Sequence, residues 1–135
     1  VAGAESTDIA AVNLFSEIRA KAKKLNEDER AKQIADAKAR LDANHDQTLA
    51  FIDSTAYLSD NEKLTLKTHA TKTLLSSKSA TDSAASTALI SEAVVKGADE
   101  LRALAEKARQ DDASAKAQQI AAAESALKAA VASPR

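Results

Sequence analysis

The chain of 135 residues contains no cysteine and no tryptophan, and aromatic residues make up only 2% of it. Without cysteine there is neither a disulfide framework nor a thiolate nucleophile. The scarcity of aromatic side chains removes the stacking surfaces on which proteins bind single-stranded nucleic acid. Lysine and arginine number 19 against 20 aspartates and glutamates, so no field of one sign attracts nucleic acid or an anionic membrane. We therefore expect no nucleic-acid partner.

Helix-breaking residues are almost missing as well: there are two glycines, Gly3 and Gly97, and one proline, Pro134. Alanine, lysine, glutamate, glutamine and leucine, which are good helix formers, fill much of the chain. No apolar run approaches the roughly 20 residues that a membrane-spanning helix needs, so we expect no membrane insertion of this segment. The composition predicts an all-α fold.

With so few breakers, helix boundaries have to be read from capping residues. The stretch Ser59-Asp60-Asn61-Glu62 has the form of a capping box, in which the Ser59 hydroxyl accepts from the Glu62 amide and the Glu62 carboxylate accepts from the Ser59 amide. A near-copy lies 33 residues earlier, where Asn26 follows several lysines, and a spacing of that size is typical of helix–turn–helix repeats. These patterns predict helix starts at Ser59 and Asn26.

Two further helix starts are predicted on similar grounds. Ser79 to Asp82 follows the weak helix formers Ser76 to Lys78, which predicts a turn. Asp111 and Asp112 follow Lys107 and Arg109, as acidic residues at a helix start follow basic residues at a helix end.

Apolar residues recur at helical spacing within the predicted segments. The longest stripe consists of Ile34, Ala37, Leu41, His45, Leu49, Ile52 and Ala56. A second stripe consists of Ile90, Val94, Gly97, Leu101, Leu104 and Ala108. Because short turns place sequential helices side by side, we expect an elongated antiparallel bundle with three parts. The parts are an N-terminal helix over 1–26, a three-helix module over 27–110, and a C-terminal helix over 111–135 that packs on the N-terminal segment.

No residue pattern indicates a reaction. Acid–base catalysis needs carboxylates in a pocket with little water, whereas clusters such as Glu27-Asp28-Glu29 fall at predicted helix ends in solvent. Asp42, His45 and Asp46 have a spacing compatible with metal ligation, but no second histidine or cysteine completes the set. Since His45 lies in an apolar stripe, a histidine bonded to a neighbouring carboxylate at the core edge is favoured. We expect no catalytic residue, no metal and no cofactor.

Five residues are predicted to contact a protein partner: Phe51, Tyr57, Leu64, Lys67 and Val95. Phe51 and Val95 lie off the apolar stripes of their helices, Leu64 lies at the edge of a helix with two apolar sides, and Tyr57 begins a turn. Exposed apolar side chains of this kind can anchor an interface. Lys67 belongs to a lysine series that is otherwise typical of a solvated face. The competing interpretation is that the apolar members pack against the terminal segments.

An apolar helix that ends in Tyr57-Leu58-Ser59 and is followed by Glu62-Lys63 is a recognisable succession. With the helix that follows, it resembles the GA-type three-helix modules of giant Gram-positive surface proteins, including those that alternate with FIVAR modules. The resemblance covers about residues 46–108. It departs from that family at Ser76 to Asp82, which is richer in serine and lysine, and the first 40 residues show no FIVAR-like aromatic pattern. The resemblance implies an extracellular, cell-surface location and a binding face around Tyr57 and Leu64.

Three functions follow from these patterns. The first is a monomeric, non-catalytic cell-surface module that acts as a rod-like spacer or as an adhesin for a host serum or matrix protein, as the resemblance implies. The second is the helical ectodomain of a parasite surface coat protein. The third is an exchangeable lipid-binding helix bundle, against which the narrow, alanine-bearing stripes argue.

Overall fold

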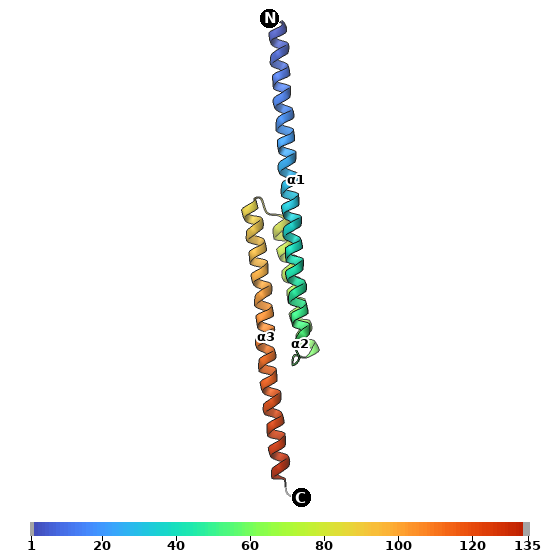
Figure 1. Ribbon diagram of the computed structural model, residues 1–135, viewed down its shortest axis with the longest axis vertical. Helices are drawn as coiled ribbons and strands as arrows, with labels where there is room; N and C mark the ends of the chain where they lie inside the picture. Colours follow the sequence, from blue (N-terminus) through green and yellow to red (C-terminus); the bar gives the residue numbers. More distant parts are fainter. Residues whose placement is uncertain (1, 134–135) are drawn as a thin grey trace.

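The computed structural model describes residues 2–133, with side chains described from residue 8 onward. This part of the chain forms three helices and no strand: α1 (Ala2–Ser54), α2 (Asp60–Asp82) and α3 (Thr87–Ala132). The all-α prediction is therefore confirmed. Figure 1 shows that α1 and α3 are much longer than α2 and continue beyond it in opposite directions. Val1 and residues 134–135, which belong to the predicted terminal helices, lie outside the described residues.

Polar contacts fix the direction of each helix. The Lys38 Nζ lies 2.9 Å from the Asp82 Oδ1. Lys38 lies near the point where α1 enters the bundle, and Asp82 is the last residue of α2. These two helices are therefore antiparallel. The Thr87 hydroxyl, at the first residue of α3, donates to the Gln33 side chain of α1 at 2.8 Å. Near the other end the Tyr57 amide donates to Asp112 at 2.7 Å, so α1 and α3 are parallel.

The core lies where all three helices run together. One cluster of buried residues consists of Ile52, Leu58, Leu66, Ala70, Leu101, Leu104 and Ala108, and a second consists of Ala37, Ala84 and Ile90. Leu41, Ile52 and Leu101 have no exposed surface. The two apolar stripes that the sequence predicts thus supply most of the core, although Ala56 lies after the end of α1 and is exposed. Burial of such side chains contributes about 25 cal/mol per Å² of apolar surface.

All three helices come into close contact at Gly97 of α3. A Cβ atom added there would lie 2.6 Å from the Ser77 Oγ of α2 and 2.7 Å from the Leu41 Cδ2 of α1. Glycine costs a helix about 1 kcal/mol relative to alanine. Here it permits a contact that a methyl group would prevent, as its place in the apolar stripe predicts.

Two predicted helix starts are wrong. Helix α1 runs without a break through Asn26, and α3 runs without a break through Asp111. Capping residues satisfy the free backbone groups at a helix end. A helix ends there only if tertiary packing stabilises a turn in the chain. Every residue of α1 from 8 to 32 is exposed, so no other element packs on this part of the helix, and good helix formers fill it. The helix therefore continues.

Among the described residues, the predicted contact between the terminal segments is also absent. We call residues 8–29 of α1 the N-terminal overhang and residues 116–132 of α3 the C-terminal overhang. Every residue of both is exposed. Because α1 and α3 are parallel and only partly overlap, the overhangs project from opposite ends of the bundle (Figure 1). They cannot pack on each other within one chain.

The predicted turn at Ser76 to Asp82 is wrong as well, because α2 runs through it and the turn falls at Ser83 to Ser86. Serine and threonine form helices weakly in isolation, but tertiary packing overrides that preference here. Ser77 and Thr81 are buried, and the Thr81 hydroxyl donates to the Ser77 carbonyl at 2.8 Å. Ser86 then caps α3 by accepting from the Leu89 amide at 3.2 Å.

The capping box at Ser59 is confirmed. The Ser59 hydroxyl accepts from the Glu62 amide at 3.1 Å, and the Ser59 amide donates to the Glu62 carboxylate at 3.4 Å. Asp60 and Glu62 also place negative charge in the first turn, where the helix dipole favours it.

We predict that Ser59→Ala lowers the free energy of unfolding by about 1 kcal/mol, since it removes the acceptor for an amide at the helix start. Ser79→Ala is the matched control: Ser79 is exposed within α2, and alanine is the better helix former there, so stability should stay the same or rise slightly. Urea unfolding followed by circular dichroism measures both. Equal losses in the two variants would contradict the boundaries of α2.

Candidate functional site

The five residues predicted to bind a partner do not form one surface. Leu64 and Val95 are exposed, at 60% and 59%, but they lie on α2 and α3 respectively. Phe51 is 39% exposed and lines a groove between α1 and α3, whereas Val95 lines another groove between the same helices, nearer the start of α3. Half-buried Lys67 pairs with Asp53 of α1 at 2.9 Å. Their role in binding stays a prediction.

Tyr57, the fifth of these residues, helps to hold a turn. Its amide donates to the Asp112 carboxylate of α3 at 2.7 Å, and the Lys116 Nζ lies 5.8 Å from the centroid of its ring. A cation over an aromatic face at this distance is an attractive contact. The turn between α1 and α2 is thus anchored to α3 at the point where α3 leaves the bundle.

The opposite turn is held in the same manner. The Arg30 guanidinium of α1 donates to the Ala85 carbonyl at 2.7 Å, in the turn between α2 and α3. The Thr87 hydroxyl donates to Gln33 one helical turn further on. Each long helix therefore anchors the turn made by the other two helices, just where it passes out of the bundle.

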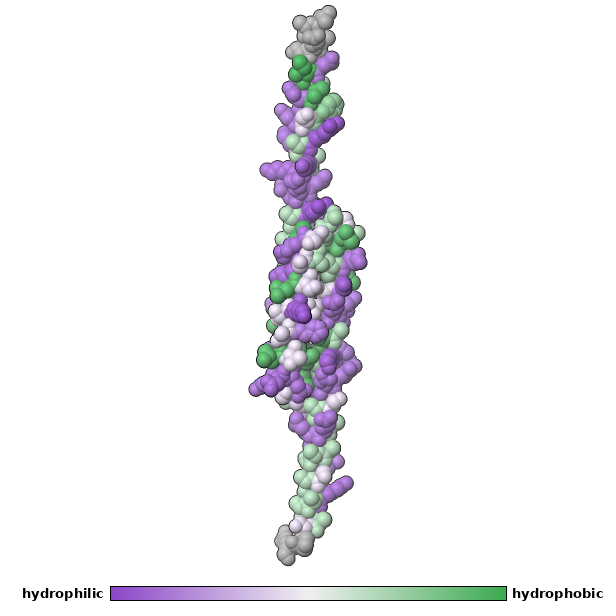
Figure 2. Space-filling view, turned by 180° about the vertical axis from the view of Figure 1, so that it is seen from behind, coloured by the Kyte–Doolittle hydropathy of each residue, from purple (hydrophilic) through white to green (hydrophobic). Residues whose placement is uncertain are grey.

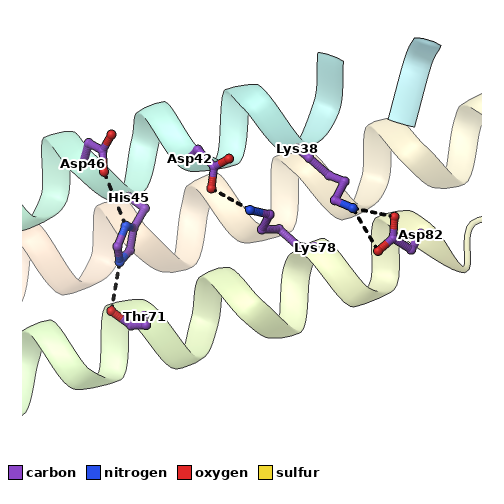
Figure 3. Close-up of polar contacts among 7 residues, drawn as sticks. All are labelled: Lys38, Asp42, His45, Asp46, Thr71, Lys78 and Asp82. Carbon is purple, nitrogen blue, oxygen red and sulfur yellow. Dashed lines mark hydrogen bonds and ion pairs between the residues drawn. The ribbon is translucent and has the colours of Figure 1, made fainter. Parts of the chain in front are cut away.

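A polar seam of partly exposed side chains joins α1 to α2, and Figure 3 shows its contacts. In order along the helices it consists of Lys38 with Asp82 at 2.9 Å, Asp42 with Lys78 at 2.9 Å, and His45 with Thr71 at 3.0 Å. Partly exposed ion pairs stabilise a fold by about 1 kcal/mol or less each. Their alternating sign, with a cation then an anion on α1, favours one register of the two helices.

His45 takes the place that the sequence predicts for it, at the edge of the core. Its ring is only 11% exposed, and its Nδ1 lies 3.6 Å from the Asp46 carboxylate. The remaining ring nitrogen meets the Thr71 hydroxyl, so both nitrogens have polar neighbours. Among the described residues no three histidine, cysteine or acidic side chains gather closely enough to hold a metal ion.

Glu106 and Arg109 form an exposed pair one turn apart on α3. The hydrogen bond from Arg109 lowers the pKa of the Glu106 carboxyl, and the same bond raises the pKa of the guanidinium. A carboxyl with a lowered pKa stays ionised at neutral pH and is a poor proton donor. This pair therefore supports the helix as an i, i+3 contact and does not resemble a catalytic acid.

Exposed apolar side chains lie on both overhangs. The N-terminal overhang exposes Ile9, Val12, Leu14, Phe15, Ile18 and Leu25, each by more than half. The C-terminal overhang exposes Ile120, Leu127 and Val131. Figure 2 shows hydrophobic colour on both projecting ends as well as on the bundle. Helical spacing places Leu14, Ile18 and Leu25 on one face, but the C-terminal segment that is predicted to pack on the N-terminal one projects from the opposite end of the bundle (Figure 1).

No described helix is both long and apolar enough to cross a membrane. No family model, no curated protein and no solved structure matches the chain. The candidate site therefore rests on the geometry of the chain itself.

Proposed function

We propose that this chain is a rod-like, non-catalytic spacer module of a cell-surface protein. The observation that supports the proposal is the parallel course of α1 and α3, which makes the chain enter the bundle at one end and leave it at the other (Figure 1). A module with this topology adds length to a protein. A globular domain with adjacent termini adds much less.

The length of the rod follows from helix geometry. Helix α1 runs about 47 Å from its start to Gln33, the level at which α3 begins alongside it. Helix α3 continues for about 68 Å from Thr87 to Ala132. The described chain is therefore about 115 Å long, and for most of that length its backbone is hydrogen-bonded within a helix.

The cell-surface location rests on the resemblance of residues 46–108 to GA-type modules, carried by the succession from Tyr57 to Lys63. In this structure those residues cap α2 and anchor the first turn, so they have a clear structural role. That role serves a spacer directly, because the turn fixes the direction in which α3 leaves.

Small-angle X-ray scattering tests the rod. We predict a maximum dimension of about 115 Å and a radius of gyration of about 28 Å, against about 14 Å for a compact domain of this length. A chain whose overhangs fold back on the bundle would give a much shorter maximum dimension, and that result would refute the spacer.

A second function, binding of a host serum or matrix protein, is favoured by the outer face of α2. Leu64 and Leu75 lie eleven residues apart, which places them on the same side of the helix, and they are 60% and 63% exposed. Two exposed leucines on one face of a short helix form a potential anchor for a partner.

Affinity capture from serum and from matrix extract tests this second function. We predict that the unmodified chain captures one host protein and that Leu64→Ser weakens the capture at least about tenfold, as loss of an anchoring side chain does. Leu127→Ser is the matched control, because Leu127 is equally exposed but lies on the C-terminal overhang. Capture that is equal in both variants, or absent from the unmodified chain, would count against an adhesin.

A further inference from the structure

The two long helices carry related sequences, displaced by 86 residues. Residues 32–43 read KQIADAKARLDA, and residues 118–129 read QQIAAAESALKA. Half of the positions are identical, and they include a glutamine, an isoleucine and a leucine, which the abundance of alanine does not explain. The first segment opens the bundle part of α1, and the second lies in the C-terminal overhang.

The repeated positions are the ones that α1 uses in the core. Leu41 has no exposed surface, and Ile34 packs against the core cluster of Ala37, Ala84 and Ile90. Their counterparts Leu127 and Ile120 are 65% and 47% exposed. The C-terminal overhang thus carries the core face of a first bundle helix without the helices that would cover it.

The same displacement relates the N-terminal overhang to the bundle part of α3. The correspondences are Phe15 with Leu101, Ile18 with Leu104, and Ala22 with Ala108. The three residues of α3 are buried, and the three residues of the overhang are exposed. The N-terminal overhang therefore carries the core face of a third bundle helix.

The polar anchors recur at the same displacement. Asp112, which accepts from the turn between α1 and α2, corresponds to Asn26, another side chain that can accept a hydrogen bond. Arg30, which donates to the turn between α2 and α3, corresponds to Lys116, another cationic donor. Asn26 and Asp112 both look like helix starts in the sequence, and Asp112 instead accepts a hydrogen bond from a neighbouring turn.

We propose that each overhang is one helix of a further three-helix bundle. The C-terminal overhang is the first helix, and its partner is an antiparallel helical hairpin of the α2–α3 kind. The N-terminal overhang is the third helix of a bundle of the same kind. This inference extends the proposed spacer by naming what binds its ends, and scattering by the unmodified chain tests the spacer separately.

The charged residues of the C-terminal overhang further restrict which hairpin can pack on it. At the position of Lys38 the C-terminal overhang has Glu124, and at the position of Asp42 it has Lys128. The two charges of the polar seam are therefore reversed. Against an identical copy of α2, each of the two ion pairs would become a contact between like charges.

The fitting hairpin accordingly carries opposite charges in its first helix. To pair with Glu124, the partner needs a cation at the position that Asp82 has in α2. To pair with Lys128, it needs an anion at the position that Lys78 has in α2. The partner is thus a hairpin with the apolar pattern of this chain and the reverse charge at these two positions. An exact copy of the chain is disfavoured.

A chimera tests the proposal in the whole chain. Residues 1–132 are followed directly by residues 47–135, which keeps the 86-residue register and supplies the hairpin. In the swapped chimera the added hairpin carries Lys78→Glu and Asp82→Lys, and in the unswapped chimera it keeps the natural residues.

Amide hydrogen exchange is followed over residues 117–132. We predict that the swapped chimera slows this exchange at least about 100-fold relative to the natural chain, because the segment joins a cooperative core.

Two controls separate this outcome from a general failure to fold. In a reference chimera, residues 1–116 are followed by residues 31–135, so the second bundle uses the first helix and hairpin that already pack together. Leu127→Asp in the swapped chimera should return the exchange of residues 117–132 to its rate in the natural chain. The same substitution in the natural chain should leave the urea midpoint of its bundle unchanged.

Several results would overturn the proposal. One is fast exchange of residues 117–132 in the swapped chimera while the reference chimera forms two bundles. Failure of the reference chimera to form a second bundle would also contradict it, because bundles of this kind would then be unable to share a helix. Equal urea midpoints for the swapped and unswapped chimeras would refute the charge selection. The natural chain could also self-associate in a way that slows amide exchange in both overhangs. The overhangs would then be partners of each other in different copies, and the proposed hairpin would be refuted.

Discussion

The architecture depends on the two turns at the ends of α2, because together they reverse the chain twice and make α1 parallel to α3. Ser59 and Ser86 cap the helices that follow the turns. Asp112 and Arg30, each from a long helix, bond to the backbone of the turn that joins the other two helices. A turn held both locally and from outside can set the direction of a long helix. Once that direction is set, the outer helices must leave the bundle at opposite ends.

The bundle itself is narrow, and small side chains make it so. Gly97 allows α3 to approach Leu41 and Ser77, and alanine or threonine occupies several other buried positions. Such a core buries less apolar surface per residue than one of leucine and phenylalanine, so interhelical polar contacts carry more of the specificity. The seam from Lys38 to Thr71 supplies them between α1 and α2. Its reversed charges on the C-terminal overhang show how similar apolar faces can still choose different partners.

Local signals made part of this structure predictable. The capping box at Ser59 could be identified because all of its groups lie within four residues, and the core stripes could be identified because helical spacing alone determines them. The helix starts at Asn26 and Asp111 could not be judged locally, since a break depends on whether another element draws the chain aside. The spacing of Phe15 and Ile18 is that of an apolar helix face, but whether the C-terminal segment can reach this face depends on the parallel course of α1 and α3, which no local pattern specifies. Comparison of the chain with itself at 86 residues, instead of 33, is the signal that points to the related long helices.

The rod exists only if α1 and α3 continue as rigid helices past the bundle. Because the chain has no cysteine, two spin labels can be placed at Asp8→Cys and Ala35→Cys without further changes. These positions flank Asn26 and lie 27 residues apart, so one continuous helix gives a single narrow distance distribution near about 40 Å in a double electron–electron resonance measurement. A broad distribution, or one centred well below that distance, would show that α1 breaks near Asn26 and would contradict the rod and the role of its ends.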